Sequence, residues 1–275
     1  MFRINKWTHV PLIAWMGDLV ILNGDERMHG KPVALVTGAN KGIGLQIAKD
    51  LAQKGLAVLL GSRSLEAGEA AAKSLGADAH AVQLDVTDHA SIAAVATHVR
   101  KTYGRLDVLV NNAGIGSAGA QSRTPEQAVE ENHLAVVDMD ELRAVYETNV
   151  FGVVAVTQAM LPLLREAPAG RIVNISSMMG SFTLHADPSF ALRQYAGTYS
   201  SSKAALNAVT QALSIELEGT NIKINAVCPG FTATDMTGFR GGSVEEAARE
   251  PVRLALLGHD SPTGGFSNAE GALPW

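Results

Sequence analysis

The stretch from Val33 to Gly44 reads VALVTGANKGIG and predicts the fold of the whole chain. Its first residues, Val33–Thr37, form an apolar β-branched run that is typical of a buried strand. Gly38, Gly42 and Gly44 follow at a spacing that allows a sharp turn from a strand into a helix. Because such a turn directs backbone N–H groups and a helix N-terminus at one point, the stretch predicts a phosphate-binding loop.

The alternation of strand and helix continues after this stretch. The strands are expected to be parallel and covered on both faces, because their runs stay apolar instead of alternating. We therefore expect an α/β protein, with a single-domain Rossmann-type doubly wound parallel sheet flanked by helices. The expected strands are Val33–Thr37, Ala57–Gly61, Ala79–Leu84, Leu106–Val110, Arg171–Ser176 and Ile222–Val227, and the expected helices include Ile43–Gln53, Ser91–Tyr103, Asp140–Arg165 and Ser200–Leu217.

Composition narrows the functional classes. At 275 residues with 47% hydrophobic content, the chain can bury one large core. Its 22 basic and 27 acidic residues give a net charge of −5 without a basic cluster, which argues against a nucleic-acid partner. The lone Cys228 excludes an intrachain disulfide and favours a reducing compartment, so we expect a cytoplasmic protein. The eight His residues are scattered without ligand spacing, so no metal site is expected.

The first part of the chain stands apart from this pattern. Val10–Leu22 is apolar, but Gly17 and Asp18 interrupt it and it is too short to span a bilayer. We expect residues 1–30 to be an N-terminal extension, either dispensable or, alternatively, an interface or targeting element. We expect residues 31–275 to form one domain that carries the phosphate-binding loop, and no membrane partner is expected.

Two basic residues indicate which nicotinamide cofactor the loop takes. NAD sites usually carry an acidic residue after the second strand to bind the ribose 2′-hydroxyl, whereas an Arg there suits a 2′-phosphate. The second strand here ends in LGSRS, residues 60–64, with Arg63 and no acid. Lys41 in the glycine loop could face the same phosphate. The pair favours NADP(H).

Tyr199 and Lys203 carry the main chemical signal. They lie four residues apart in YSSSK, so a helix places both on one face. A phenol has a pKa of about 10, and a fixed ammonium nearby would lower it. Tyr199 would then serve as general acid for ketone reduction or as base for alcohol oxidation. The spacing alone is common on helix surfaces, so the surrounding motifs decide whether Tyr199 and Lys203 form a catalytic pair.

Those motifs resemble the short-chain dehydrogenase/reductase family from Pro32 to the C-terminus. The loop at Cys228–Phe231 and the end of the second strand are similar to the NADPH-dependent carbonyl reductases within it. The motifs, in the order of the family, are Thr37–Gly44, Asp85-Val86, Asn111–Gly114, Asn149, Ser177, the Tyr199/Lys203 pair, and Pro229-Gly230 with Thr234.

The resemblance implies a role for each motif. Tyr199 exchanges a proton with the substrate oxygen, Lys203 lowers its pKa and holds the nicotinamide ribose, Ser177 rather than Ser176 binds the carbonyl oxygen, and Asn149 supports a water-mediated proton path. The implied cofactor-binding residues are Gly38, Asn40, Lys41, Gly42, Ile43, Gly44, Arg63, Asp85, Val86, Asn112, Ala113, Gly114, Tyr199, Lys203, Pro229, Gly230, Thr232 and Thr234.

Several of these residues have an alternative structural role. Asn112 and Gly114 could stabilise the sheet, Asp85 could cap the backbone near Thr87, and Asn149 could only disrupt its helix. Met178 and Met179, next to Ser177, could be core residues or could line the substrate side of a pocket.

The segment between Ser177 and Tyr199 is longer than the common form of the family. We expect Phe182–Ala196 to form a loop or short helix over the substrate, and its intermediate length leaves monomer and homo-oligomer open. The resulting hypothesis is an NADP(H)-dependent oxidoreductase acting on a small-molecule carbonyl or alcohol: an aldehyde, ketone or quinone. A non-catalytic NADP(H)-binding regulator and an epimerase that uses Tyr and Lys are the alternatives.

Overall fold

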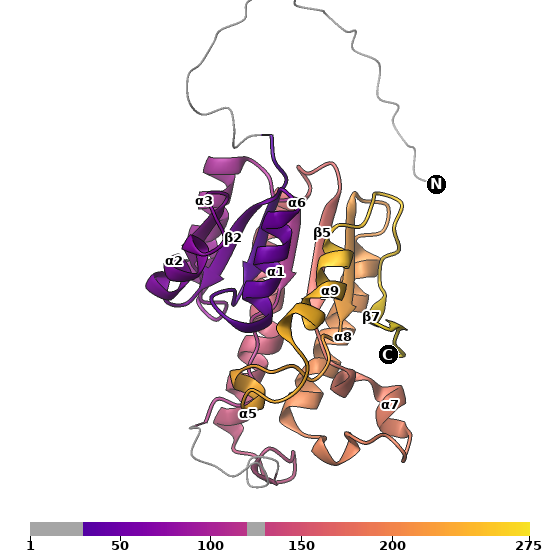
Figure 1. The fold of residues 1–275 in the computed structure, drawn as a ribbon. Helices are drawn as coiled ribbons and strands as arrows, with labels where there is room; N and C mark the ends of the chain where they lie inside the picture. Colours follow the sequence, from indigo (N-terminus) through magenta and orange to yellow (C-terminus); the bar gives the residue numbers. More distant parts are fainter. Residues whose placement is uncertain (1–29, 120–129) are drawn as a thin grey trace, which may run out of the picture.

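One eight-stranded sheet forms the centre of the computed structural model, which describes residues 30–119 and 130–275 (Figure 1). The strand order is β3-β2-β1-β4-β5-β6-β7-β8, with neighbours parallel except for the antiparallel pair β7 and β8. The strands are β1 Val33–Thr37, β2 Ala57–Ser62, β3 Ala79–Gln83, β4 Val108–Asn111, β5 Gly170–Ile175, β6 Ile222–Val227, β7 Phe266–Asn268 and β8 Gly271–Ala272.

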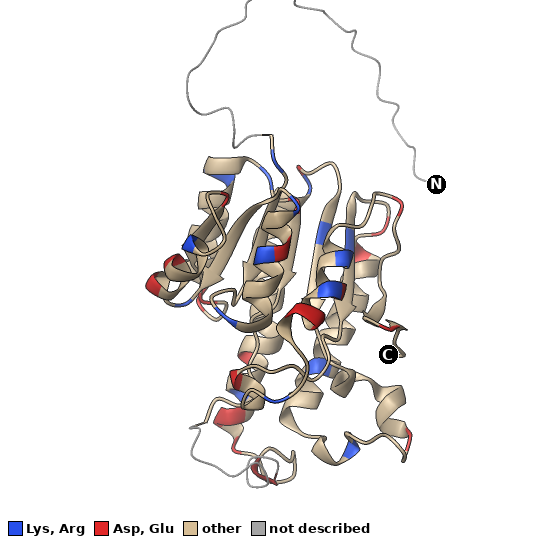
Figure 2. Ribbon diagram, in the orientation of Figure 1, with Lys and Arg blue, Asp and Glu red and all other residues tan. Residues whose placement is uncertain are grey.

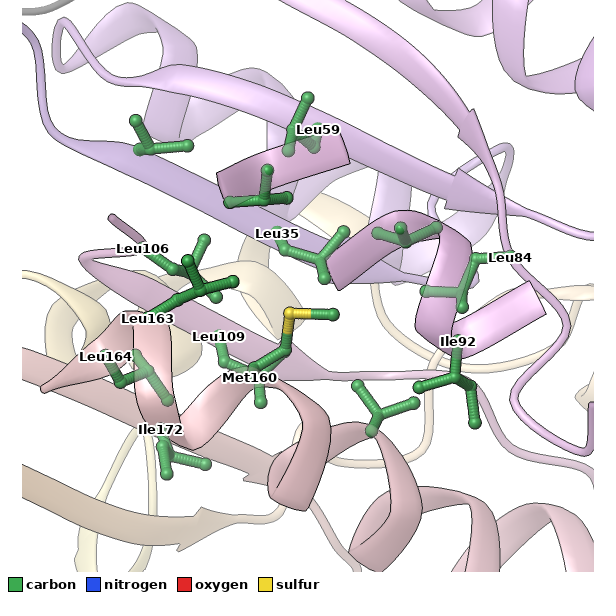
Figure 3. Close-up of a cluster of buried hydrophobic side chains, with 14 of the residues drawn as sticks. Leu35, Leu59, Leu84, Ile92, Leu106, Leu109, Met160, Leu163, Leu164 and Ile172 are labelled. Atoms are coloured by element: carbon green, nitrogen blue, oxygen red, sulfur yellow. The ribbon is translucent and has the colours of Figure 1, made fainter. Parts of the chain in front are cut away.

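Helices cover both faces of this sheet, as in a doubly wound fold. One hydrophobic cluster lies on each face of the sheet. The helices α3, α6 and α8 pack on one face, and α1, α2 and α9 pack on the other. Figure 3 shows the first cluster, where Met160 of α6 lies among leucines of the strands. The helices are α1 Gly42–Gln53, α2 Leu65–Lys73, α3 His89–Tyr103, α5 Met139–Tyr146, α6 Gly152–Leu164, α7 Phe182–Ala186, α8 Thr198–Glu216 and α9 Val244–Ala255.

The alternation along β1 shows why its residues must all be apolar. Val33 and Leu35 belong to one cluster, whereas Ala34 and Val36 belong to the other. Successive side chains of a strand point to opposite faces, so a strand covered on both sides needs an uninterrupted apolar run. The six expected strands and the α/β class are confirmed.

Two features of the sheet and helices were not predicted. The strands β7 and β8 are only three and two residues long, too short to give a periodic signal. The expected helix Asp140–Arg165 is divided into α5 and α6 by a π-helical turn at Glu147–Phe151. Such turns occur frequently at functional sites.

The surface of the protein carries charges of both signs. Figure 2 shows Lys and Arg interspersed with Asp and Glu in this view, with no single-sign face. Among the described residues one helical stretch, Met139–Leu164, is long and apolar enough to cross a membrane by length and composition. Half of its most apolar window is buried inside the protein, where α6 packs against α3 and β4. The predicted extension at residues 1–30 lies, except for Gly30, outside the described residues.

Candidate active site

The candidate site lies at the carboxyl ends of the parallel strands. In a doubly wound sheet, the loops at this edge diverge where the strand order reverses, here between β1 and β4. Figure 1 shows α5 and α7 beyond the same edge. The fold therefore brings the loops after β1, β2, β4, β5 and β6 to one edge of the sheet.

The glycine loop turns as the sequence predicts. Gly38 and Gly42 have φ angles of 63° and 58°, a left-handed conformation that L side chains rarely adopt. A side chain on Gly44 would meet the carbonyl oxygen of Gly38 at 2.5 Å. The first turn of α1 can therefore lie directly against the loop only because these positions carry no Cβ. Asn40 and Ile43, on the same loop, are partly buried.

The N-terminus of α1 is left without a side-chain cap. Lys41 occupies the capping position and makes no capping hydrogen bond. By contrast, α2, α3 and α9 each begin with a Ser or Asp whose side chain accepts a backbone N–H. The first N–H groups of a helix need an acceptor from outside it, and an anion can supply one. The α1 terminus thus fits a bound phosphate group.

Lys41 also connects two loops of the site. Its Nζ lies 3.2 Å from Oδ2 of Asp235, in the turn after β6. A Cβ on Gly42 would lie 3.4 Å from Cγ2 of Thr234. Arg63 follows the last residue of β2 and is exposed, and no acid stands in the 60–64 stretch. The structure therefore places the two basic residues near the sheet edge where a 2′-phosphate is predicted; their roles stay predictions.

Asn112 fastens the loop after β4 to the glycine loop. Its Nδ2 donates to the carbonyl oxygens of Thr37 and Gly38 at 2.9 and 3.0 Å. The hydroxyl of Thr37 accepts from the backbone nitrogens of Asn112 and Ala113. These bonds give Asn112 a structural role, and a cofactor contact from the same loop stays a prediction.

Asp85 and Val86 follow β3. The Oδ1 atom of Asp85 accepts from both the backbone nitrogen and the hydroxyl of Thr87, at 2.9 and 2.7 Å. The alternative in which Asp85 caps the local backbone thus has direct support. Val86 is buried in the first hydrophobic cluster. Neither contact excludes adenine binding by this turn, which stays a prediction.

The reacting pair lies in the first turns of α8. The Tyr199 phenol hydrogen-bonds the Ser177 side chain across from the end of β5. Lys203 is buried, and its Nζ donates to the carbonyl oxygen of Ile175 at 2.8 Å and lies 5.6 Å from the centre of the Tyr199 ring. The hydroxyl of Ser176 is already bonded to Asn207, 2.5 Å away. Ser177, and not Ser176, is therefore the serine beside the Tyr199 phenol, and its predicted role toward a substrate carbonyl stays a prediction.

Burial dominates the titration of this pair. It raises the pKa of the Tyr199 phenol to about 12, against a lowering by the Ser177 hydrogen bond. It also lowers the pKa of the Lys203 ammonium to about 8. In the chain by itself the phenol is therefore protonated at neutral pH, and the expected lowering of its pKa by Lys203 is not found. A protonated phenol is the form that a general acid needs.

Asn149 lies in the π-helical turn and is fully buried. Its side chain exchanges hydrogen bonds with the backbone of Ile115, both at 2.9 Å, and donates to the hydroxyl of Ser202 at 3.1 Å. A Cβ on Gly114 would lie 3.2 Å from Asn149 Oδ1 and 3.5 Å from Lys203 Nζ. The helix distortion and the approach of Asn149 to Lys203 thus occur together, and a part for Asn149 in a proton path stays a prediction.

The loop after β6 closes this edge of the site. Gly230 has a φ of 81°, and the hydroxyl of Thr232 lies 3.4 and 3.2 Å from the carbonyl oxygens of Pro229 and Gly230. Thr234 begins a short 3-10 turn at Asp235–Thr237. The loop is thus preorganised by its own backbone.

Sequence reasoning missed Asn207, one helical turn after Lys203. Its Oδ1 accepts from Ser176 and its Nδ2 donates to the carbonyl oxygen of Gly180 at 3.2 Å. These two bonds fasten both ends of the turn that carries Ser177 to the helix that carries Tyr199. No sequence signal distinguishes Asn207, because most buried residues of α8 are polar and the partners of Asn207 are distant in sequence.

The doubly wound sheet, the uncapped glycine loop and the Ser–Tyr–Lys arrangement together define a dinucleotide-dependent oxidoreductase of the Rossmann type. A family model described as short chain dehydrogenase matches residues 32–242. The chain belongs to the short-chain dehydrogenase/reductase family.

Curated relatives and solved structures agree with this membership. The chain is 34% identical to (−)-isopiperitenone reductase of Mentha piperita, over 87% of this chain and 97% of that protein. It is also 34% identical to carbonyl reductase (NADPH) 1 of Mus musculus, over 89% and 99% of the two chains. The solved structure of NADPH-bound carbonyl reductase from chicken fatty liver is similar with a TM-score of 0.71 and 31% identity, over 89% of this chain and 99% of that one.

Described residues include no group of three or more His, Cys, Asp or Glu side chains arranged to hold a metal ion. The free Cys228 is buried, and its thiol has a pKa raised by burial.

Proposed function

We propose that the protein is an NADP(H)-dependent reductase of carbonyl compounds, such as an aldehyde, a ketone or a quinone. The observation that carries the proposal is the Tyr199 phenol, protonated and hydrogen-bonded to Ser177, with Lys203 one helical turn further on. The similarity to NADPH-dependent reductases supports the choice of cofactor and of reaction.

The residues of the site fit this cofactor. The glycine loop and the uncapped α1 would hold the pyrophosphate, and Lys41 and Arg63 would bind the 2′-phosphate. Lys203 would hydrogen-bond the ribose next to the nicotinamide, because its ammonium is buried beside Tyr199. When bound, NADPH supplies the hydride.

The protein's own contribution is to orient the carbonyl and to supply the proton. Ser177 would donate to the carbonyl oxygen, which stabilises the negative charge that develops there. Tyr199 would then give its proton to the same oxygen, since an alkoxide is a stronger base than a phenolate. Asn149, beside Lys203, would hold a water that returns the proton from solvent. Burial raises the pKa of the Tyr199 phenol further above neutral, so the phenol keeps the proton that a general acid needs.

Oxidation of NADPH in the presence of aldehydes, ketones and quinones tests the proposal. Turnover of at least one carbonyl, with NADPH used in preference to NADH, is the expected result. Tight NADPH binding without turnover of any carbonyl would favour the regulator instead. Such a regulator has no need for Tyr199 and Lys203 together, and both are present.

We further propose that residues 1–30 are dispensable, that residues 31–275 form the catalytic domain, and that the protein is cytoplasmic.

Deleting residues 1–27 should leave kcat, KM and the thermal midpoint unchanged, because the family match begins only at residue 32. The two proteins can be compared by NADPH oxidation and thermal unfolding. A fall in the midpoint by several degrees would assign the extension a structural role.

A further inference from the structure

The C-terminal segment, residues 273–275, lies against the Ser177–Thr183 segment that borders the reacting pair. The carbonyl oxygen of Pro274 accepts the hydroxyl of Ser181 at 2.7 Å. The backbone oxygen of Trp275 accepts the backbone nitrogen of Thr183 at 3.0 Å. These residues lie outside the stretch that matches the family model, residues 32–242.

The Trp275 side chain anchors this contact to the core. Its ring stacks on Phe266 of β7, with centroids 5.3 Å apart and planes 22° from parallel. Phe266 forms a buried cluster with Ala226 and Cys228, and Met178 packs against this cluster together with Trp275. Trp275 and Met178, the residue directly after Ser177, thus pack against the same buried cluster at the sheet edge.

The two residues that bond to the C-terminal segment, Ser181 and Thr183, stand on either side of Phe182. Ser181 also caps α7, accepting the backbone nitrogen of Leu184 at 3.1 Å. Phe182 is 73% exposed, and it lines a cavity of about 250 Å³. The same cavity is lined by Met179, two residues after Ser177, and by Ser200, next to Tyr199. The hydrogen bonds of Ser181 and Thr183 therefore hold the backbone from which the Phe182 side chain projects.

The lining of this cavity is mixed but largely apolar. Apolar side chains line it from three segments: Leu134 before α5, the Ser177–Thr183 segment, and α8. The remaining lining residues are small or polar. Apart from Met179, Phe182 and Ser200, the lining residues are Leu134, Gly180, Ser181, His185, Ala196, Gly197, Ser201 and Ala204.

We infer that Trp275 is a positioning residue that sets the size of the apolar ketone accepted by the site. The inference rests on the proposed function. By stacking on Phe266 and holding the start of α7, Trp275 keeps the Phe182 side of the cavity in place. A small aldehyde would not reach this cavity wall, whereas a bulky apolar ketone would pack against it.

The variant Trp275→Ala separates these two substrate types. We expect kcat/KM for a bicyclic or aryl ketone to fall about tenfold relative to a small aldehyde, mainly through KM. The Kd for NADPH should stay within about twofold, because the glycine loop lies at a different part of the sheet edge. Trp275→Phe, which keeps a stacking ring, should restore most of the ratio.

Glu270→Ala is the matched control, since Glu270 is exposed in the turn between β7 and β8 of the same C-terminal region. It should leave the ketone-to-aldehyde ratio unchanged. An unchanged ketone-to-aldehyde ratio in Trp275→Ala would overturn the inference. If kcat/KM falls equally for both substrates, Trp275 contributes to overall stability only.

Hydrogen exchange gives a readout that needs no turnover. The Thr183 amide donates to the Trp275 backbone, so its exchange should become about tenfold faster in Trp275→Ala, with exchange in β1 and α1 unchanged. Unchanged exchange at Thr183 would refute the anchoring by the Trp275 ring. If wild-type protein reduces no carbonyl, the proposed function fails, but this measurement still decides whether the anchor exists.

Discussion

Tyr199→Phe is expected to lower kcat for carbonyl reduction by about 10²- to 10⁴-fold, because the substitution removes the hydroxyl that is proposed to transfer the proton. The ring and its position beside Lys203 remain, so the Kd for NADPH should change little. Steady-state NADPH oxidation measures the first quantity, and fluorescence titration with NADPH measures the second.

Tyr103→Phe provides the control for this substitution. Tyr103 is the last residue of α3 and precedes β4, so it lies at the sheet edge opposite the candidate site. It loses the same hydroxyl group without changing the reacting pair, so its activity should match wild type. A Tyr199→Phe enzyme that keeps most of its activity would remove Tyr199 from the role of general acid.

Arg63→Ala is expected to weaken NADPH binding by about 10- to 100-fold, the range for a lost hydrogen bond to a charged group. NADH lacks the 2′-phosphate, so its binding should change by less than about twofold. The ratio of the two Kd values therefore isolates the phosphate contact. Isothermal titration with each cofactor gives both numbers.

Lys73→Ala is the control for removal of one positive charge, since Lys73 is exposed at the end of α2. It should alter both affinities little. Equal losses for NADPH and NADH in Arg63→Ala would show that Arg63 does not read the 2′-phosphate. Lys41 would then be the remaining basic candidate, although it already faces Asp235 at 3.2 Å.

The arrangement of the sheet was predictable because its information is local. The run Val33–Val36 is apolar at every position, as expected for a strand covered on both faces. The glycines after it predict the turn, and the φ angles of Gly38 and Gly42 confirm it. The placement of Tyr199 and Lys203 on one helix face was predictable for the same reason, since four residues make about one helical turn.

The short strands β7 and β8 show where local information ends. Strand β7 pairs with β6, which is distant in sequence, and β8 pairs with β7 through a short turn. The five residues of β7 and β8 carry no periodic pattern. The π-helical turn at Asn149 is likewise set by partners elsewhere: the backbone of Ile115 and the hydroxyl of Ser202. No pattern within the helix itself distinguishes this turn from a continuous helix.

The sequence by itself determined the glycine loop between β1 and α1 and the spacing of Tyr199 and Lys203, because each is encoded within one strand–turn–helix unit or one helical turn. Only the tertiary structure decided how these parts are held. Burial of the Tyr199 phenol raises its pKa. Met178 packs on the Phe266 cluster while Met179 lines the cavity, although the sequence treats them alike. Burial and contacts between distant segments depend on how the whole chain packs, and no local pattern records them.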